Sequence, residues 1–280
     1  MDNKLLEDFI KRALEEDIGD GDHTSLACIP AAIIGKARLL AKQPGILAGI
    51  KIAEAVLEIT DPKLLSRVFV EDGSSINSGD ILMEIQGPSR SILIAERLML
   101  NILQRMSGIA TQTGLYVEKV RGTAARILDT RKTTPNVRLL EKEAVRIGGG
   151  GNHRMGLYDM ILIKDNHIDY AGGIENAIAR THSYLAGTGR DLRIEIEARS
   201  FDELDSILET GGVDRILLDN FTPSDTKMAV RKINGRFETE SSGGITLDNV
   251  RDYAEAGVDY ISVGALTHHI LSLDMSLKAF

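Results

Sequence analysis

The chain has 280 residues, of which 43% are hydrophobic and 26% are charged, as is typical of a globular protein with one or two domains. Its formal net charge of −8 argues against a general nucleic-acid-binding surface, and no apolar run approaches the roughly 18 residues needed to span a membrane. The single cysteine, Cys28, excludes an internal disulfide framework and is typical of a reducing compartment.

The first half of the chain predicts a small domain of mixed helices and strands. Its first residues lack the basic start and apolar core of a signal peptide, so we expect a cytoplasmic protein. Apolar residues from Leu5 to Leu14 recur at helical spacing, and Gly19 should end that helix. The following acidic loop, 19–25, is interpreted as solvated, because no bidentate glutamate follows at calcium-loop spacing; its role stays open. Strands are expected over 36–42, 67–73 and 80–87, with a helix over 53–59.

A long amphipathic segment over 91–119 predicts one helix or a helix pair, interrupted near Ser107 and Gly108. It carries Arg97 and Arg105 among leucine, isoleucine and methionine residues. On spacing alone, each arginine is interpreted as a solvated side chain or a member of a structural ion pair.

The second half contains six short apolar runs that each end on a charged or glycine-rich cluster. Helix-like stretches separate them, which is the pattern of parallel strands alternating with helices. We therefore expect a parallel α/β barrel with its functional side chains at the carboxyl ends of the strands. The clusters are DTRKTTP (129–135), IKDNHI (163–168), EIEA (195–198), LLDNF (217–221), ESSGG (240–244) and SVGA (262–265).

Positive charge gathers at the early strand ends. Residues 126–170 hold eight Lys or Arg and six Asp or Glu, so the rest of the chain carries a net charge of −10. A run of four glycines, 148–151, lets backbone amides approach an anion closely. The cations beside it suit a small anionic ligand, since arginine pairs with carboxylates and lysine with phosphates. His167 is expected to brace the loop after Lys164.

Acidic and glycine-rich clusters occupy the later strand ends. Strand alternation places Glu195 and Glu197 on one face, and Asp219 ends the next strand. These carboxylates are interpreted as partners of the cations, as Mg²⁺ ligands, or as groups facing positive charge that develops on a sugar ring. Loops after late barrel strands frequently bind phosphate, which indicates such a site at 242–244 and 264–265.

The combination of these clusters resembles a known family, the quinolinate phosphoribosyltransferases, also called nicotinate-nucleotide pyrophosphorylases. The resemblance rests on DTRKTTP, on GGGGNHRMGLYDMILIKDNHI (148–168), on LLDNF and on SVGALTHH (262–269). Segments 73–93 and 96–111 also look like that family, so nearly the whole chain is covered. The resemblance implies an α/β fold, with an N-terminal α/β sandwich domain over 1–113 and an open, seven-stranded α/β barrel over 114–270. The tail, 271–280, is expected to pack back on the first domain.

The family resemblance implies transfer of a phosphoribosyl group from phosphoribosyl pyrophosphate to quinolinate, with decarboxylation. The products would be nicotinate mononucleotide, pyrophosphate and CO₂, in the de novo synthesis of NAD. Mg²⁺ is the implied cofactor. The implied assembly is a homodimer in which Arg97 reaches the neighbouring subunit's site.

The same resemblance assigns roles to particular residues. Arg131, His153, Arg154 and Lys164 would bind the two quinolinate carboxylates, and Lys132 would meet the pyrophosphate. Glu197 and Asp219 would lie beside the ribose and Mg²⁺, holding the ion directly or indirectly. The catalytic group would comprise Lys132, Lys164, Glu197 and Asp219. The 5′-phosphate pocket would be lined by Ser242, Gly243, Gly264 and His268.

Three alternatives are open at this stage. A molybdenum-transport-associated paralogue shares much of the pattern. A barrel lyase would use Lys164 to form a Schiff base. A non-catalytic anion-binding protein would need the cations but has no evident use for Glu197 and Asp219.

Overall fold

The protein is described by a computed structural model that covers residues 3–280. Contacts within the chain divide it into two compact units. The first unit comprises residues up to 114 together with 133–149 and 266–280, and the second comprises 115–132 and 150–265. The sequence predicts a first domain of 1–113 on which the tail 271–280 packs; the contact-defined first unit also contains 133–149 and 266–270.

The first unit is built on an antiparallel sheet with the strand order β12-β1-β5-β3. Its last strand comes from the C-terminal end of the chain and pairs with β1 from Ala37–Ala279 to Ala41–Met275. β3 covers Leu65–Val68 instead of the expected 67–73, because the chain bends at Phe69 and Val70 and turns again at Gly73, with φ of +88°. The strands of this unit are β1 (Ile34–Ala41), β2 (Gly45–Ile46), β3 (Leu65–Val68), β4 (Ser75–Ile76), β5 (Ile81–Pro88) and β12 (Met275–Ala279).

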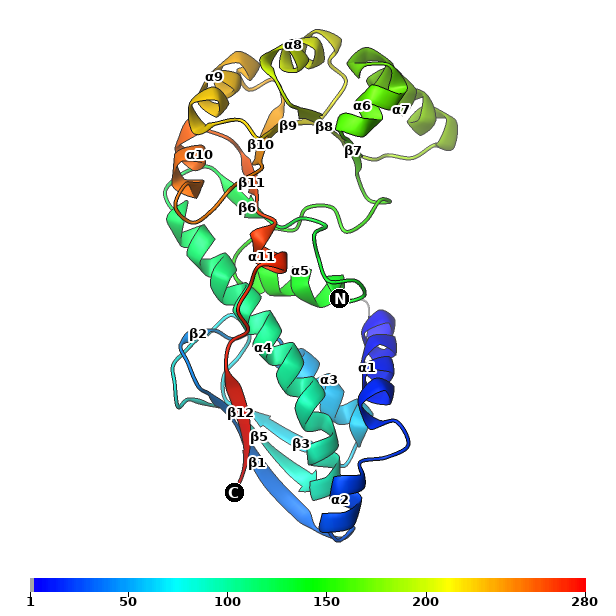
Figure 1. Cartoon of the computed structure of the whole chain (residues 1–280), viewed down its shortest axis with the longest axis vertical. Helices are drawn as coiled ribbons and strands as arrows, with labels where there is room; N and C mark the ends of the chain where they lie inside the picture. Colours follow the sequence, from blue (N-terminus) through cyan, green and yellow to red (C-terminus); the bar gives the residue numbers. More distant parts are fainter. Residues whose placement is uncertain (1–2) are drawn as a thin grey trace. The chain divides into compact units, whose positions relative to one another are not determined.

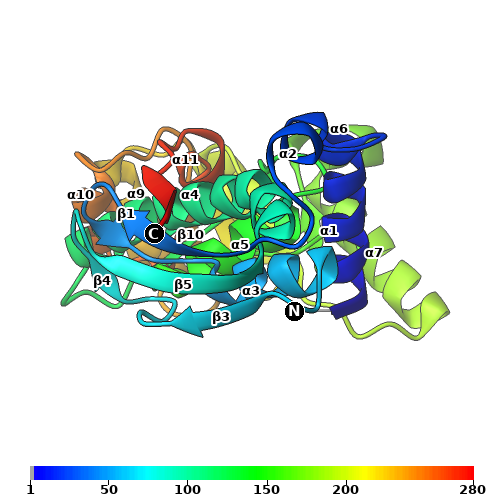
Figure 2. The same ribbon diagram turned by 90° about the horizontal axis from the view of Figure 1, so that it is seen from below.

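Helices cover this sheet, and α4 runs along it (Figures 1 and 2). Gln104 on α4 fixes the contact by donating to the carbonyl of Met275 at 2.9 Å. The acidic loop 19–25 has a local structural role, because Asp22 accepts a hydrogen bond from the Ser25 amide and caps α2. The helices are α1 (Asn3–Ile18), α2 (His23–Cys28), α3 (Ile50–Thr60), α4 (Ser89–Lys119), α5 (Arg138–Ile147) and α11 (Ala265–His268); α4 continues beyond this unit, and α11 begins at its edge.

The interruption expected near Ser107 and Gly108 is wrong, since α4 is continuous from Ser89 to Lys119. Glycine occupies position 108 for a packing reason. A Cβ atom there would lie 2.3 Å from the carbonyl oxygen of Leu271, so only glycine allows the C-terminal segment to approach the helix this closely.

The second unit is an open α/β barrel made of a parallel sheet with the order β6-β11-β10-β9-β8-β7. Figure 1 shows these strands as an arc with helices on its outer side. The six strands expected from the apolar runs are confirmed. The seven implied by the family resemblance are not, because the additional element is a single parallel bridge between Gly151 and Leu128. The strands are β6 (Arg126–Leu128), β7 (Ile161–Ile163), β8 (Ile194–Ala198), β9 (Arg215–Asp219), β10 (Glu238–Ser242) and β11 (Tyr260–Ser262).

Alternation along the strands separates the core of this unit from the barrel interior. On β8, Ile194 and Ile196 pack in the hydrophobic cluster under the helices, and the alternating residues Glu195 and Glu197 face the other way. The covering helices are α6 (Asp165–Ala171), α7 (Ile174–Thr188), α8 (Phe201–Thr210), α9 (Pro223–Ile233) and α10 (Val250–Ala256). None of the helices within residues 3–280 has the length and apolar composition required to cross a membrane.

Candidate active site

An ion pair joins two of the expected site residues at neighbouring strand ends. Lys164 follows β7, and its ammonium contacts Glu197 Oε1 near the end of β8. Glu197 is almost fully buried, whereas nearly half of the Lys164 side chain is exposed. His167 Nδ1 accepts from the Lys164 amide at 2.9 Å, which confirms its expected bracing role.

Asp219, at the end of β9, lies in the same electrostatic environment. Burial raises its pKa above the usual value, and the charge of Glu197 raises it further, while Lys164 acts in the opposite sense. Two carboxylates this close in charge interaction are a suitable pair of oxygen donors for a divalent cation. Glu197 and Asp219 therefore fit Mg²⁺ in donor type.

Arg154 provides a buried positive charge near these acids. Only 8% of the residue is exposed, and its Nη1 donates to the carbonyl of Met160 at 3.1 Å. Burial lowers the pKa of Arg154, and the neighbouring charge of Arg131 lowers it further. The structure thus brings two arginines of the early strand ends together, as a dianionic ligand would require.

The loop that carries Arg154 is held in place by hydrogen bonds to Asp129. Asp129, fully buried at the end of β6, accepts from the Asn152 side chain at 2.6 Å and from the His153 amide at 2.9 Å. The His153 ring is also engaged, because its Nδ1 accepts from the Arg154 amide at 2.8 Å. Sequence reasoning did not identify Asp129, although its place before the basic cluster 131–132 was the available signal.

A buried acidic pair, Glu195 on β8 and Glu240 on β10, lies inside the barrel. Glu195 lies two residues before Glu197 on β8, and Glu240 lies two residues before Ser242 on β10, so each shares a strand face with an expected site residue. Both are 0% exposed, and burial raises the pKa of each to about 7. Arg215 on β9 donates to Glu240 at 2.8 Å. Sequence reasoning considered Glu195 but missed Glu240 and Arg215.

The late strand ends form a tight glycine turn. Ser242 pairs in register with Asp219, and its carbonyl accepts from the Asn220 amide at 2.8 Å. Gly243 has φ of +95°, and a Cβ there would lie 2.1 Å from Asn220 Oδ1. No other residue type fits, so the turn can present its backbone amides directly. Gly264 follows β11 by two residues.

Three further expected residues are Lys132, Arg97 and His268. Lys132 is exposed, and its amide donates to Thr130 Oγ1 at 3.0 Å. Arg97 is an exposed residue of α4, and its side chain makes no hydrogen bond or ion pair with any residue from 3 to 280. His268 is the last residue of α11 and belongs to the first unit.

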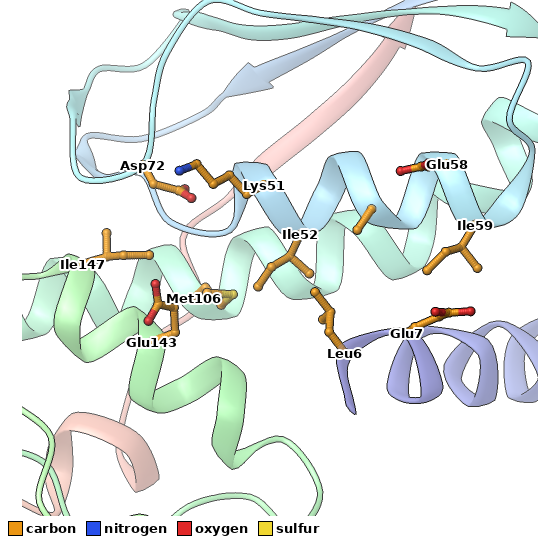
Figure 3. A pocket seen from close by; sticks show the side chains of 11 residues that line it. Leu6, Glu7, Lys51, Ile52, Glu58, Ile59, Asp72, Met106, Glu143 and Ile147 are labelled. Carbon is orange, nitrogen blue, oxygen red and sulfur yellow. The ribbon is translucent and has the colours of Figure 1, made fainter. Parts of the chain in front are cut away.

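A cavity of about 630 Å³ in the first unit is a poor match for an anionic ligand. Figure 3 shows four acidic side chains around it and one lysine, Lys51. The acids are Glu7, Glu58, Asp72 and Glu143. The strand ends of the second unit are therefore the better candidate site.

The comparisons with known proteins identify the family. Residues 22–107 match the family described as "Quinolinate phosphoribosyl transferase, N-terminal domain", and residues 109–278 match its C-terminal domain. The chain belongs to the quinolinate phosphoribosyltransferase family. The two domain matches together cover nearly the whole chain, as the resemblance in the sequence does.

Relatives of this family have high identity over most of the chain. The carboxylating nicotinate-nucleotide pyrophosphorylase of Mycobacterium leprae is 44% identical, covering 96% of this chain and 95% of its own length. The chloroplastic protein of the same name from Oryza sativa is 45% identical, covering 98% of this chain and 77% of its own. The crystal structure of NadC from Streptococcus pyogenes has a TM-score of 0.93 at 38% identity, covering 99% of this chain and 97% of that one.

Proposed function

We propose that this protein transfers the phosphoribosyl group of phosphoribosyl pyrophosphate to quinolinate and releases CO₂, forming nicotinate mononucleotide and pyrophosphate for NAD synthesis. Relatives over the full length of the chain carry the name of this enzyme. The observation that carries the proposal is the arrangement of charges in the barrel: cations follow the early strands, and carboxylates and a glycine turn follow the late ones.

The cationic side would bind quinolinate. Arg131 and Arg154 each offer a planar fork for a carboxylate, and the pair suits a ring that carries two of them. Lys164 would add a point charge close to the carboxylate that is lost. Because Arg154 is buried, its charge acts in a low-dielectric environment where it binds an anion more strongly than in water.

The acidic side would face the ribose. When pyrophosphate leaves with the bonding electron pair, positive charge develops on the anomeric carbon and ring oxygen. Glu197 and Asp219 would stabilise that charge through fixed negative groups. We propose that the same two residues hold Mg²⁺, directly or through water. Mg²⁺ would neutralise charge on the pyrophosphate of the substrate.

Decarboxylation follows from the new bond. The quinolinate nitrogen attacks the anomeric carbon and becomes a positively charged pyridinium nitrogen. The adjacent carbon then releases CO₂, keeps the bonding pair, and takes up a proton. Since no covalent bond to the protein is required, the chain's main task is to position two anionic substrates, which its fixed cations can do.

The glycine turn would bind the 5′-phosphate of the substrate, and an exposed lysine would bind its pyrophosphate. Ser242, Gly243 and Gly264 would bind the 5′-phosphate through backbone amides and a hydroxyl, with His268 as a further donor. Lys132 would bind the departing pyrophosphate.

We also propose a homodimer and a cytoplasmic location. Arg97 is an exposed arginine without a partner within residues 3–280, as expected of a side chain that acts in a neighbouring subunit. Arg97→Ala should therefore impair catalysis, and mixing it with inactive Arg131→Ala subunits should restore part of the activity. No restoration in mixed dimers would contradict a shared site.

Pyrophosphate release in the presence of Mg²⁺ tests the proposed function directly. We expect release with phosphoribosyl pyrophosphate and quinolinate, accompanied by stoichiometric CO₂, and none when nicotinate replaces quinolinate. Pyrophosphate release with nicotinate but not with quinolinate would contradict the proposal. Borohydride trapping of Lys164 with a carbonyl substrate would instead indicate a Schiff-base lyase.

A further inference from the structure

The buried acidic pair is unusual for a barrel interior, which apolar side chains normally fill. Glu195 and Glu240 are 0% exposed, and Arg215 Nη1 donates to Glu240 Oε2 at 2.8 Å. Both oxygens of Glu195 and Oε1 of Glu240 accept no well-aligned hydrogen bond from any residue within 3–280. Buried carboxylate oxygens of this kind need a donor or a cation.

His153 is the group that these oxygens face. Its Nε2 lies 2.9 Å from Glu195 Oε2 and 3.5 Å from Glu240 Oε1. Its other ring nitrogen, Nδ1, accepts from the Arg154 amide at 2.8 Å and therefore carries no proton. The ring proton then lies on Nε2, the nitrogen that contacts the acidic pair.

A metal ion is the alternative occupant, because ligand atoms of His153, Glu195 and Glu240 all lie within 4.8 Å of one another. A metal-bound histidine normally donates its second ring N–H to an acceptor. Here the second nitrogen is itself an acceptor, so Nε2 has no lone pair for a metal. Arg215 already places a cation beside Glu240. These contacts favour a proton over a metal between His153 and the carboxylates.

We propose that Glu195 and Glu240 are positioning residues that orient Arg154 for the substrate through the His153 ring. The acidic pair fixes the ring at Nε2, and the ring fixes the Arg154 amide at Nδ1, while Asp129 holds the His153 amide at 2.9 Å. This support reaches Arg154 through the two nitrogens of the His153 ring. This inference rests on the proposed function for its kinetic consequence but not for its structural one.

Glu195→Leu and Glu195→Gln provide a matched kinetic test. Leucine removes the acceptor, whereas glutamine keeps one carbonyl oxygen for the His153 Nε2–H. We expect Glu195→Leu to raise KM for quinolinate at least tenfold, with kcat and the KM for phosphoribosyl pyrophosphate within about threefold, since about 1.4 kcal/mol corresponds to one factor of ten. Glu195→Gln should stay within threefold of wild type in all three constants.

Glu240→Gln is the second variant, because it keeps an acceptor for Arg215 in case Glu195→Leu does not fold. It should behave as Glu195→Gln does. An equal change in all kinetic constants for Glu195→Leu, or an unchanged KM for quinolinate, would overturn the proposal.

Imidazole ¹⁵N NMR of the full-length protein separates this inference from the proposed function. With His153→Gln used for assignment, wild type should show His153 protonated at Nε2 and unprotonated at Nδ1, and Glu195→Leu should lose that preference. A protein that lacked quinolinate activity but showed this tautomer would contradict the function alone. Stoichiometric metal found by elemental analysis and lost in Glu195→Gln, or a His153 proton on Nδ1, would overturn the positioning role.

Discussion

Arg105 on α4 places two guanidinium nitrogens on one carboxylate oxygen of Glu141 on α5, at 2.8 Å from Nε and 2.6 Å from Nη2. Glu141 is buried, and its second oxygen accepts from the Thr134 amide at 3.1 Å. The same arginine also reaches the Thr267 carbonyl at 3.2 Å. One ion pair therefore joins α4, α5 and the C-terminal segment within the first unit.

Arg105→Ala should destabilise the protein by about 3–5 kcal/mol, because it leaves the Glu141 charge buried without its partner. Arg146→Ala is the control, since Arg146 pairs with Glu143 on the same helix but is largely exposed; it should cost less than about 1 kcal/mol. Urea unfolding measures both free energies. Equal losses would show that Glu141 does not depend on Arg105.

Gly108→Ala should destabilise the protein although alanine favours helices, because the new Cβ would lie 2.3 Å from the Leu271 carbonyl oxygen. We expect a loss of about 1–3 kcal/mol from overpacking. Gly187→Ala, in α7, is the matched control, since nothing lies within 4 Å of its Cβ position. It should stabilise by about 0.5–1 kcal/mol. Thermal unfolding compares the two, and a stabilising Gly108→Ala would contradict the close approach.

The stability of the protein should fall between about pH 4.5 and pH 7 through Glu240 of the buried acidic pair. Burial raises the pKa of Glu240 to about 7, so across that interval the folded state holds a proton that the unfolded state has released. The unfolding free energy contributed by this group is therefore present at low pH and lost as pH rises. Glu240→Gln should reduce the loss by on the order of 1–3 kcal/mol, and exposed Glu209→Gln should not. Identical pH profiles for wild type and Glu240→Gln would contradict the raised pKa.

Arg131→Ala should weaken the binding free energy for quinolinate by about 2–5 kcal/mol, as expected when one member of a desolvated charge pair is removed. Calorimetric titration with quinolinate measures the affinity, and circular dichroism checks the fold. Arg180→Ala, an exposed residue of α7, should bind as wild type does. Wild-type affinity in Arg131→Ala would contradict the quinolinate site.

Asp219→Asn should raise the Mg²⁺ concentration required for half-maximal activity at least tenfold, because it removes one of two adjacent carboxylates. Asp205→Asn, which breaks a surface pair with Lys232, is the control and should leave that concentration unchanged. Full activity in EDTA would contradict the proposed role of the metal.

The strand ends could be predicted from the sequence because each apolar run stops at a polar cluster. That pattern located Lys164, Glu197 and Asp219 before any contact was known. The continuity of α4 could not be predicted, since the reason for Gly108 is Leu271, far away in the chain. Glu240 was missed for a similar reason: its partners Arg215 and His153 come from other parts of the barrel. The alternation of side chains along a strand predicts which side of the sheet a glutamate faces, but not which residues contact it there.

The pairing of β12 with β1 has a consequence for how the protein is made. A ribosome delivers β1 early and β12 last, so the edge of the first sheet is open throughout synthesis. A nascent chain must keep that edge unpaired until Met275–Ala279 emerge, and a prematurely terminated chain never covers it. Exposed edges of this kind pair readily with other strands, so we expect a chain cut before Met275 to aggregate more readily than one that includes β12.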